Sequence, residues 1–272
     1  MNDFKGKAIY NPSGKAGEYS YWACNFYVGC SNECAYCYLK KGRGAKVLGG
    51  NVPTLKKCFK NEAHALDVFT AELHKNIEDL KKHGLFFSFS TDPMLSETIR
   101  LTLEATKYAV NFGVPVKILT KTGLLAFKMF NDDVTFYTGL DKSMVAFGVT
   151  LTGDDESELN AKSNAERIET LLMAKKFGYK TFVSFEPMFS DWYVLDILRK
   201  YHSSIDMAKI GLESGSGKIK YMHEFIEDVL QIECMRTKIY LKDSLIKMAN
   251  LKREQLWGNA VERDYNLFSK PV

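Results

Sequence analysis

The sequence predicts an α/β protein whose parallel sheet curves toward a barrel, and two observations support this class. Short apolar runs rich in β-branched and aromatic residues alternate with segments whose apolar residues recur every three to four positions, which is typical of strands alternating with helices. The second observation is that polar residues directly follow the apolar runs. Strands that alternate with helices pair in parallel through right-handed crossovers. With 272 residues the chain has the size of one barrel domain.

The first unit of this alternation contains a long strand and a long helix. We expect a strand over 19–28 that leads into a cysteine-rich loop, and a surface loop over 40–53, which holds five glycines or prolines. A helix is expected over 62–83, because Leu66, Phe69, Leu73, Ile77 and Leu80 fall on one face. Gly84 follows it, where a left-handed residue commonly ends a helix.

The later units repeat the pattern to the end of the chain, without an internal repeat or an interdomain linker. Glycines close two of the helical segments, at Gly113 and Gly178. In order, we expect strand 85–90, helix 96–112, strand 115–119, helix 124–131, strand 144–151, helix 164–177, strand 181–185, helix 192–201, strand 205–211, helix 222–235, strand 238–241 and helix 244–251.

Polar side chains stand at the carboxyl end of each early strand, where parallel α/β folds place their active sites. A ring of such groups facing one mouth favours a barrel-like arrangement over a flat sheet. The groups, strand by strand, are Cys30; Ser90, Thr91 and Asp92; Thr120 and Lys121; Thr150 and Thr152; Ser184 and Glu186; Glu213 and Ser214.

Composition places the chain among ordinary globular proteins. Hydrophobic residues make up 46% and charged residues 26% of the sequence. No run of 18 apolar residues occurs, and the first residues show no apolar signal-peptide core, so we expect no membrane association and a cytoplasmic location. The net charge of +4 is too small to indicate a nucleic-acid partner by itself.

Three cysteines on one short loop carry the chemistry. Cys30, Cys34 and Cys37 have the spacing C-x3-C-x2-C, and three thiolates so placed can hold three irons of a [4Fe–4S] cluster. The fourth iron is then open to bind a substrate or a second cofactor. The other cysteines are scattered, and we expect small buried hydrophobic roles for them: Cys24, Cys58 and Cys234.

Two alternative functions of these cysteines stay open. A zinc-stabilised nucleic-acid-binding module would need four nitrogen or sulfur ligands, whereas the loop offers a single C-x2-C pair. A non-catalytic Fe–S protein for electron transfer or sensing would use four cysteine ligands, and the loop offers three. A disulfide scaffold does not suit six cysteines in a chain of this length.

The cysteine spacing, with Tyr36 before the third cysteine, resembles the signature of the radical S-adenosylmethionine (SAM) superfamily. Within it the chain looks most like the spore photoproduct lyase-like group and the phage Gp37/Gp68-type radical SAM proteins. The resemblance implies a (β/α)6 partial TIM barrel over 1–216, with a short C-terminal α/β extension over 217–272 packed on the same domain. The supporting stretches are 90–93, 119–122, 148–152, 183–188, 211–215 and 242–244.

In that superfamily the open iron chelates SAM, and an electron from the cluster splits SAM to give a 5′-deoxyadenosyl radical that abstracts hydrogen. The resemblance implies that Thr91 and Asp92 hold the SAM amino group, a charge pairing that also makes physical sense. Lys121 would meet the SAM carboxylate or a ribose hydroxyl, Thr150 would add a hydroxyl, and the backbone at Tyr36 would face adenine. The plainer alternatives are a turn residue for Asp92, a solvated Lys121 and a partnerless Thr150.

The resemblance also places Ser90, Ser184, Glu186 and Glu213 in the cofactor-binding set. We expect the two glutamates to contact ribose or substrate, on the side of the mouth away from the cysteine loop; the alternative is an ion pair at the rim. Photoproduct lyases carry a cysteine beside the residues that hold SAM, whereas Ser90 stands there here. This departure weakens the case for thymine-dimer repair.

The expected partners follow from the resemblance. The substrate would be a nucleic acid or nucleotide, with slight support from the basic stretch 40–46 and from Lys56, Lys57 and Lys60. A peptide or a small metabolite is the alternative substrate class. The electron would come from a reductase such as flavodoxin or ferredoxin.

Overall fold

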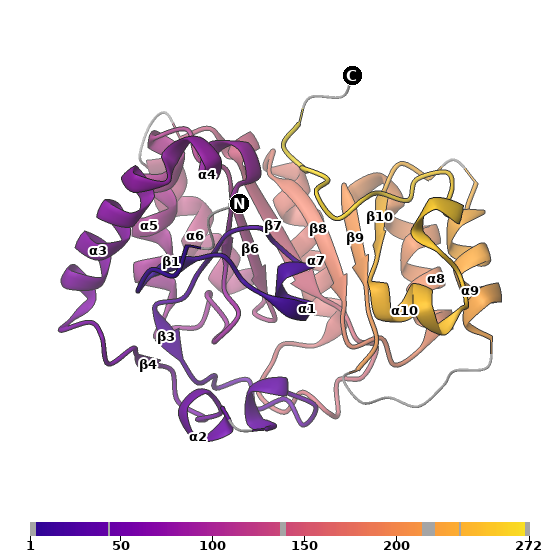
Figure 1. Ribbon diagram of the computed structural model, residues 1–272, viewed down its shortest axis with the longest axis horizontal. Helices are drawn as coiled ribbons and strands as arrows, with labels where there is room; N and C mark the ends of the chain where they lie inside the picture. The colour runs from indigo at the N-terminus through magenta and orange to yellow at the C-terminus, as the bar shows by residue number, and fades with distance from the viewer. Residues whose placement is uncertain (1–3, 43, 137–139, 214–220, 234, 270–272) are drawn as a thin grey trace.

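The fold is built on an eight-stranded sheet with the order β1-β2-β5-β6-β7-β8-β9-β10 (Figure 1). It is seen in a computed structural model that describes residues 4–42, 44–136, 140–213, 221–233 and 235–269. β1 pairs antiparallel with β2, and the other neighbours are parallel. The strands are Ile9–Tyr10 (β1), Ala23–Cys24 (β2), Leu85–Phe87 (β5), Val116–Thr120 (β6), Val145–Thr150 (β7), Lys180–Phe185 (β8), Met207–Ile210 (β9) and Lys238–Leu241 (β10).

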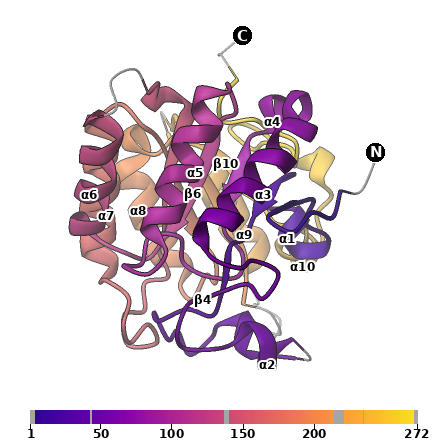
Figure 2. The same cartoon turned by 90° about the vertical axis from the view of Figure 1, so that its left-hand side faces the viewer.

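Helices cover the outer face of this sheet, so the predicted alternation of strand and helix is confirmed (Figures 1 and 2). Two short helices, Gly14–Gly17 (α1) and Ala45–Leu48 (α2), lie outside this layer; α2 falls within the stretch expected to be loop. The covering helices are Glu62–Lys75 (α3), Ile77–His83 (α4), Ile99–Asn111 (α5), Leu124–Phe136 (α6), Asn164–Lys176 (α7), Asp191–Tyr201 (α8), Met222–Leu230 (α9) and Asp243–Met248 (α10).

The strand expected over 19–28 is wrong as one element, because the chain leaves the sheet after β2. Tyr27–Val28 (β3) pairs instead with Thr54–Leu55 (β4) in a separate antiparallel ribbon. Asn25 stands at the division: its Oδ1 accepts from Phe89 N at 2.9 Å, and its Nδ2 donates to the Tyr10 hydroxyl at 2.7 Å. The side chain of Asn25 thus satisfies one backbone N–H, that of Phe89, in place of a ladder hydrogen bond.

The helix expected over 62–83 is also divided, at Asn76. This residue has φ −118° and ψ 19°, outside the helical region, and it separates α3 from α4. Its Nδ2 donates to the Glu72 carbonyl at 2.8 Å, which satisfies an acceptor that the interrupted helix leaves free. The apolar spacing continues through Asn76, so hydrophobic periodicity alone could not locate the break.

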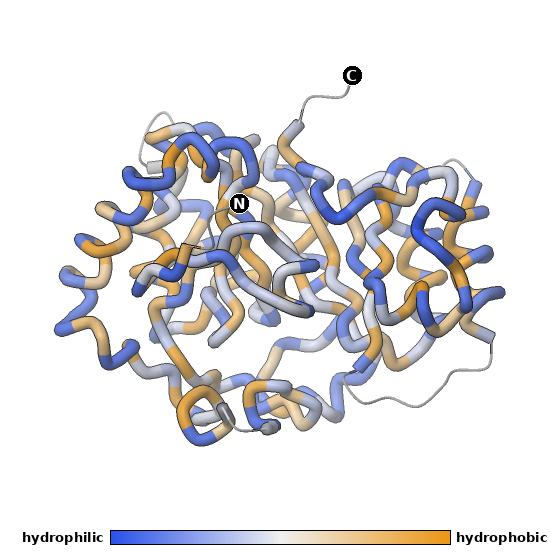
Figure 3. Tube along the Cα trace, viewed as in Figure 1, coloured by the Kyte–Doolittle hydropathy of each residue, from blue (hydrophilic) through white to orange (hydrophobic). Residues whose placement is uncertain are grey.

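The two faces of the sheet bury different sets of side chains. Outward residues such as Phe87, Phe147 and Val183 join the core between sheet and helices, and Figure 3 shows hydrophobic and hydrophilic residues alternating along those helices. The inward cluster is mostly aromatic and consists of Tyr19, Phe86, Ala146, Phe182, Met207, Tyr240 and Leu267. Gly148 makes room for it, since a Cβ there would lie 2.4 Å from the Phe182 ring.

Segments near the N-terminus and the C-terminus of the chain make contacts across the curved sheet. Glu18, shortly before β2, accepts a hydrogen bond from Asp243 N at 2.9 Å, just beyond β10 at the far edge. At the opposite end of the strands, Asn266 Nδ2 donates to the Lys82 carbonyl at 2.8 Å, so the C-terminal segment covers the amino ends of the strands. The carboxyl ends are left to the loops that carry the predicted site. Among the described residues, no helix is long and apolar enough to cross a bilayer.

Candidate active site at the carboxyl ends of the strands

The cysteine loop begins with a tight backbone approach after β3. Gly29 has φ +84°, and a Cβ there would lie 2.6 Å from the Val52 carbonyl oxygen, so glycine is required. The next amide, Cys30 N, donates to the Gly50 carbonyl at 2.9 Å. From this start the loop turns so that Cys30, Cys34 and Cys37 line one pocket.

Burial controls the protonation of the cysteines in this pocket. Burial raises the pKa of Cys30 to about 11 and also raises the pKa of Cys34. Both side chains are therefore thiols at neutral pH, and a metal would have to displace their protons to bind. Within the described ranges, no three His, Cys, Asp or Glu side chains are grouped closely enough to hold one metal ion.

Asp92 is buried and its carboxylate is fully occupied. Oδ1 accepts from Met94 N at 3.0 Å and from Thr120 Oγ1 at 2.7 Å. Oδ2 accepts from Asn32 Nδ2 at 2.9 Å and from Lys121 N at 2.7 Å. A carboxylate offers about four acceptor positions, so internal donors fill them all. The result ties the cysteine loop, through Asn32, to the end of β6.

Thr91 and Ser90 differ from Asp92 and from each other. Both side chains are buried. The Ser90 hydroxyl donates to the Tyr27 carbonyl at 2.5 Å, which gives it a local partner in β3. The Thr91 hydroxyl has no partner among the described residues. A buried polar atom without a partner is costly, and the Thr91 hydroxyl is such an atom at this strand end.

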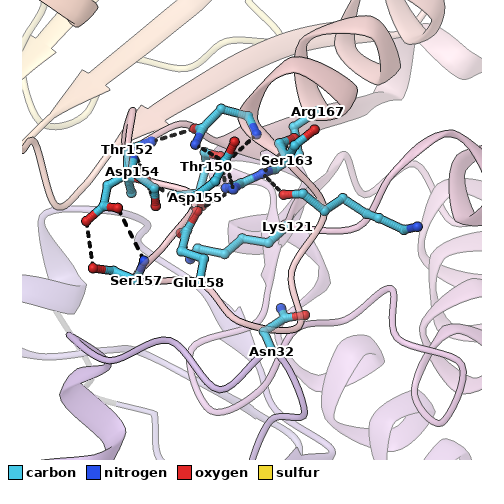
Figure 4. Close-up of polar contacts among 12 residues, drawn as sticks. Asn32, Lys121, Thr150, Thr152, Asp154, Asp155, Ser157, Glu158, Ser163 and Arg167 are labelled. Carbon is cyan, nitrogen blue, oxygen red and sulfur yellow. Dashed lines mark hydrogen bonds and ion pairs between the residues drawn. The ribbon is translucent and has the colours of Figure 1, made fainter.

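A second buried carboxylate, Glu158, lies near Lys121 and Arg167 (Figure 4). It forms an ion pair with Arg167 of α7 and accepts a hydrogen bond from the Tyr36 hydroxyl. Lys121 Nζ lies 3.9 Å from Glu158 Oε1 and 5.6 Å from the centre of the Tyr36 ring. Sequence reasoning missed Glu158, Arg167 and Asn32, because side chains that pair across the fold leave no periodic signal in the sequence.

The predicted hydroxyls of the middle strands lie side by side. Thr150 of β7 and Ser184 of β8 are direct partners in the parallel ladder, and both are buried. Ser184 is in turn the partner of Lys209 in β9, a lysine that sequence reasoning also missed. Burial, together with the charges of Lys117 and Lys242, lowers the pKa of Lys209 well below its usual value.

The two rim glutamates are both in ion pairs. Glu186 Oε1 lies 2.6 Å from Lys242 Nζ, and Glu213 Oε1 lies 2.9 Å from Lys41 Nζ. Lys41 directly follows the short 3-10 helix Tyr38–Lys40 of the cysteine loop, so the expectation that Glu213 lies away from that loop is wrong.

The remaining described cysteines differ in burial. Cys24 is buried, as expected, whereas Cys58 is exposed, because it lies in the turn that precedes α3. Ser214 and Cys234 fall outside the described residues.

Comparisons with known proteins reveal likeness in structure only. No protein-family model matches the chain, and no curated protein sequence matches it. The structure of spore photoproduct lyase complexed with dinucleoside spore photoproduct is similar at a TM-score of 0.56 and 12% identity, over 74% of this chain and 58% of that one.

SuiB of Streptococcus suis bound to S-adenosylmethionine is similar at a TM-score of 0.54 and 12% identity, over 83% of this chain and 51% of that chain. SuiB bound to its precursor peptide SuiA gives a TM-score of 0.58 and 11% identity, over 87% and 52%. The chain thus spans between half and three fifths of the length of these proteins. Their similarity shows that this chain has the same kind of partial α/β barrel as these proteins, with a mostly parallel sheet alternating with helices.

Proposed function

We propose that this chain is a radical SAM enzyme whose [4Fe–4S] cluster is held by Cys30, Cys34 and Cys37. One observation carries the proposal: the three thiols line a single pocket at the carboxyl ends of the strands, on a fold of this superfamily. When bound, the cluster and SAM supply the one-electron chemistry that removes a hydrogen atom from the substrate. The protein's own task is to position these groups and to exclude water.

The residues around the pocket divide that task. The Thr91 hydroxyl, which is buried and without a partner in the described chain, is the group available to the SAM amino end. Lys121 supplies a cation beside Tyr36 that suits the SAM carboxylate. Asp92 acts indirectly: its carboxylate holds the Lys121 backbone and the Asn32 side chain in place. Thr150 and Ser184 supply hydroxyls deeper along the strand ends.

For the substrate we propose a nucleic acid or nucleotide, acted on in a reducing cytoplasm with flavodoxin or ferredoxin as electron donor. Lys40 lines the cysteine pocket and exposed Lys46 follows on the same loop, so this surface suits phosphate groups; Lys41, beside them, is paired with Glu213. The structure of spore photoproduct lyase contains a dinucleoside. Repair of the same lesion is not part of the proposal, because Ser90 stands where a hydrogen-donating cysteine would be needed and its hydroxyl is bonded to Tyr27.

The experiment is anaerobic reconstitution followed by reaction with dithionite and SAM. We expect about four irons and about four sulfides per chain, and release of 5′-deoxyadenosine and methionine detected by mass spectrometry. Cys34→Ala should lose the visible absorbance of the cluster, and the matched control Cys58→Ala should keep it. Binding of one zinc in place of iron, or a cluster that never cleaves SAM, would overturn the proposal.

A further inference from the structure

A buried ion pair joins the loop after β7 to helix α7. The side chains of Glu158 and Arg167 are 1% and 0% exposed. Arg167 Nη1 also donates to the Thr150 carbonyl at 2.6 Å, and its Nε donates to the Lys162 carbonyl at 2.8 Å. Such bonds satisfy a buried guanidinium and compensate the charge of the glutamate, without which burial would be strongly unfavourable. Arg167 therefore fixes where the Glu158 carboxylate points.

The two oxygens of that carboxylate serve different parts of the chain. Oε2 faces the scaffold, where it meets Arg167 and accepts from Thr152 Oγ1 at 3.2 Å. Oε1 faces the cysteine loop and accepts from the hydroxyl of Tyr36, the residue directly before Cys37. Figure 4 shows Glu158 between Arg167 on one side and the loop of Asn32 on the other. The side chain thus joins a rigid helix to the metal-binding segment.

Backbone contacts extend the same junction along the loop. Ala35 N donates to the Ser157 carbonyl at 2.8 Å, and Asn160 N donates to the Asn32 carbonyl at 3.2 Å. Cys34 and Glu158 face each other as an isolated antiparallel bridge. The segment from 32 to 36 therefore lies along the segment from 157 to 160. A metal-binding loop aligned in this way loses less conformational freedom when the cluster forms.

We propose that Glu158, held by Arg167, is a positioning residue that fixes Tyr36 and the Cys34 segment for cluster binding before the cluster is present. The inference rests on the proposed function, because it assigns the loop to an iron–sulfur cluster. It adds a role for a residue whose side chain contacts the cysteine loop through Tyr36 and lies 3.9 Å from Lys121 Nζ. The support is the division of one buried carboxylate between a helix and the loop.

The first test is hydrogen exchange of the full chain before reconstitution, read on peptides that cover 30–37. Tyr36→Phe removes one hydrogen bond and keeps the ring, and Glu158→Gln keeps the shape. Each should speed exchange in this segment about tenfold, which corresponds to about 1.4 kcal/mol. The matched control is Tyr27→Phe, which removes a hydroxyl bonded to Glu62 Oε1 at 2.6 Å and should leave 30–37 unchanged.

The second test is loss of iron to a chelator after reconstitution, together with the cluster's reduction potential. Both loop variants should load iron, then lose it about tenfold faster than the parent chain, and their potential should shift. Asp206→Asn is the control for general destabilisation: Asp206 pairs with Lys175 Nζ at 2.6 Å at the amino end of β9, far from the loop. It should lower the melting temperature and leave iron loss unchanged.

The outcomes separate the two ideas. Unchanged exchange over 30–37 in both loop variants overturns the positioning role, even if the chain holds a cluster and cleaves SAM. Iron loss that tracks melting temperature across all variants, Asp206→Asn included, overturns it as well. A parent chain that binds no cluster overturns the proposed function, and the exchange measurement on the unreconstituted chain then still decides whether Glu158 holds the loop.

Discussion

Replacing Asp92 by asparagine separates its two candidate roles, as a ligand of SAM and as an anchor of the cysteine loop. Asparagine keeps one acceptor oxygen and presents an amide nitrogen in place of the other. In either orientation the nitrogen faces two donors: Asn32 and the Lys121 N–H, or Thr120 and the Met94 N–H. The Asn32 amide or the Thr120 hydroxyl can turn to accept, but a backbone N–H cannot. One N–H is therefore left without its partner.

The magnitude follows from this count. An unpaired buried N–H costs roughly 1–3 kcal/mol, and each bond that remains falls from the strength of a charged acceptor to that of a neutral one, a loss of about 1 kcal/mol each. We therefore expect Asp92→Asn to destabilise the ligand-free chain by about 3–5 kcal/mol, or roughly 10 °C in melting temperature. The assay is urea unfolding followed by circular dichroism, with and without the reconstituted cluster.

Thr91→Val is the companion variant. Its hydroxyl has no partner in the described chain, so the change should leave the unfolding midpoint unchanged or slightly raised. SAM affinity, measured by equilibrium dialysis on reconstituted protein, should fall about 10-fold or more, since a hydrogen bond to a charged group contributes about 1.5–3 kcal/mol. If Asp92→Asn instead kept full stability and only weakened SAM binding by about 10- to 150-fold, the anchor argument would be refuted and the SAM ligand role would stand.

Three further predictions rest on other parts of the structure. Alanine at Cys30, Cys34 or Cys37 should abolish the visible absorbance of the cluster, whereas Cys24→Ala should keep it, measured by anaerobic spectroscopy. Burial lowers the pKa of Lys117 to about 8, from 10.5 in the unfolded chain. Between pH 8 and pH 10.5 the unfolded state therefore binds more protons than the folded state, so the free energy of unfolding rises with pH over this range. Lys117→Met should therefore stabilise the chain by up to about 3 kcal/mol below pH 8 and by nothing near pH 10.5, and a gain independent of pH would contradict this. Glu213→Gln breaks a half-exposed pair with Lys41, so the melting temperature should change by less than about 4 °C while substrate-dependent SAM cleavage falls; a large loss of melting temperature would mark the pair as structural.

The sequence was most informative where one local pattern decides the outcome. Apolar runs and glycine stops located every strand after Gly84 to within a few residues, and the cysteine spacing located the pocket. The misplaced elements turn on single asparagines. Asn25 and Asn76 divide a strand and a helix through their own side-chain hydrogen bonds, and neither bond changes the hydrophobic period.

The site shows a similar limit. Asp92 was singled out because it follows a strand, but three of its four donors come from the cysteine loop and the end of β6, which only the fold brings to it. Glu158 and Arg167 lie nine positions apart, in a loop and a helix, and a charge in such a stretch is usually solvated. Their burial depends on the cysteine loop lying across them, which is a tertiary contact.

The aromatic filling of the curved sheet determines how a long substrate can be presented. Phe86, Phe182 and Tyr240 occupy the concave side, and the C-terminal segment covers the amino ends of the strands. A polymer cannot thread through such a barrel from one end to the other. It has to offer a single protruding unit from the loop side, such as an unstacked base or a chain terminus, and then withdraw by the same route. Each turnover on a polymeric substrate would thus be a separate binding event, and processive movement along the polymer would need a second binding site outside the barrel.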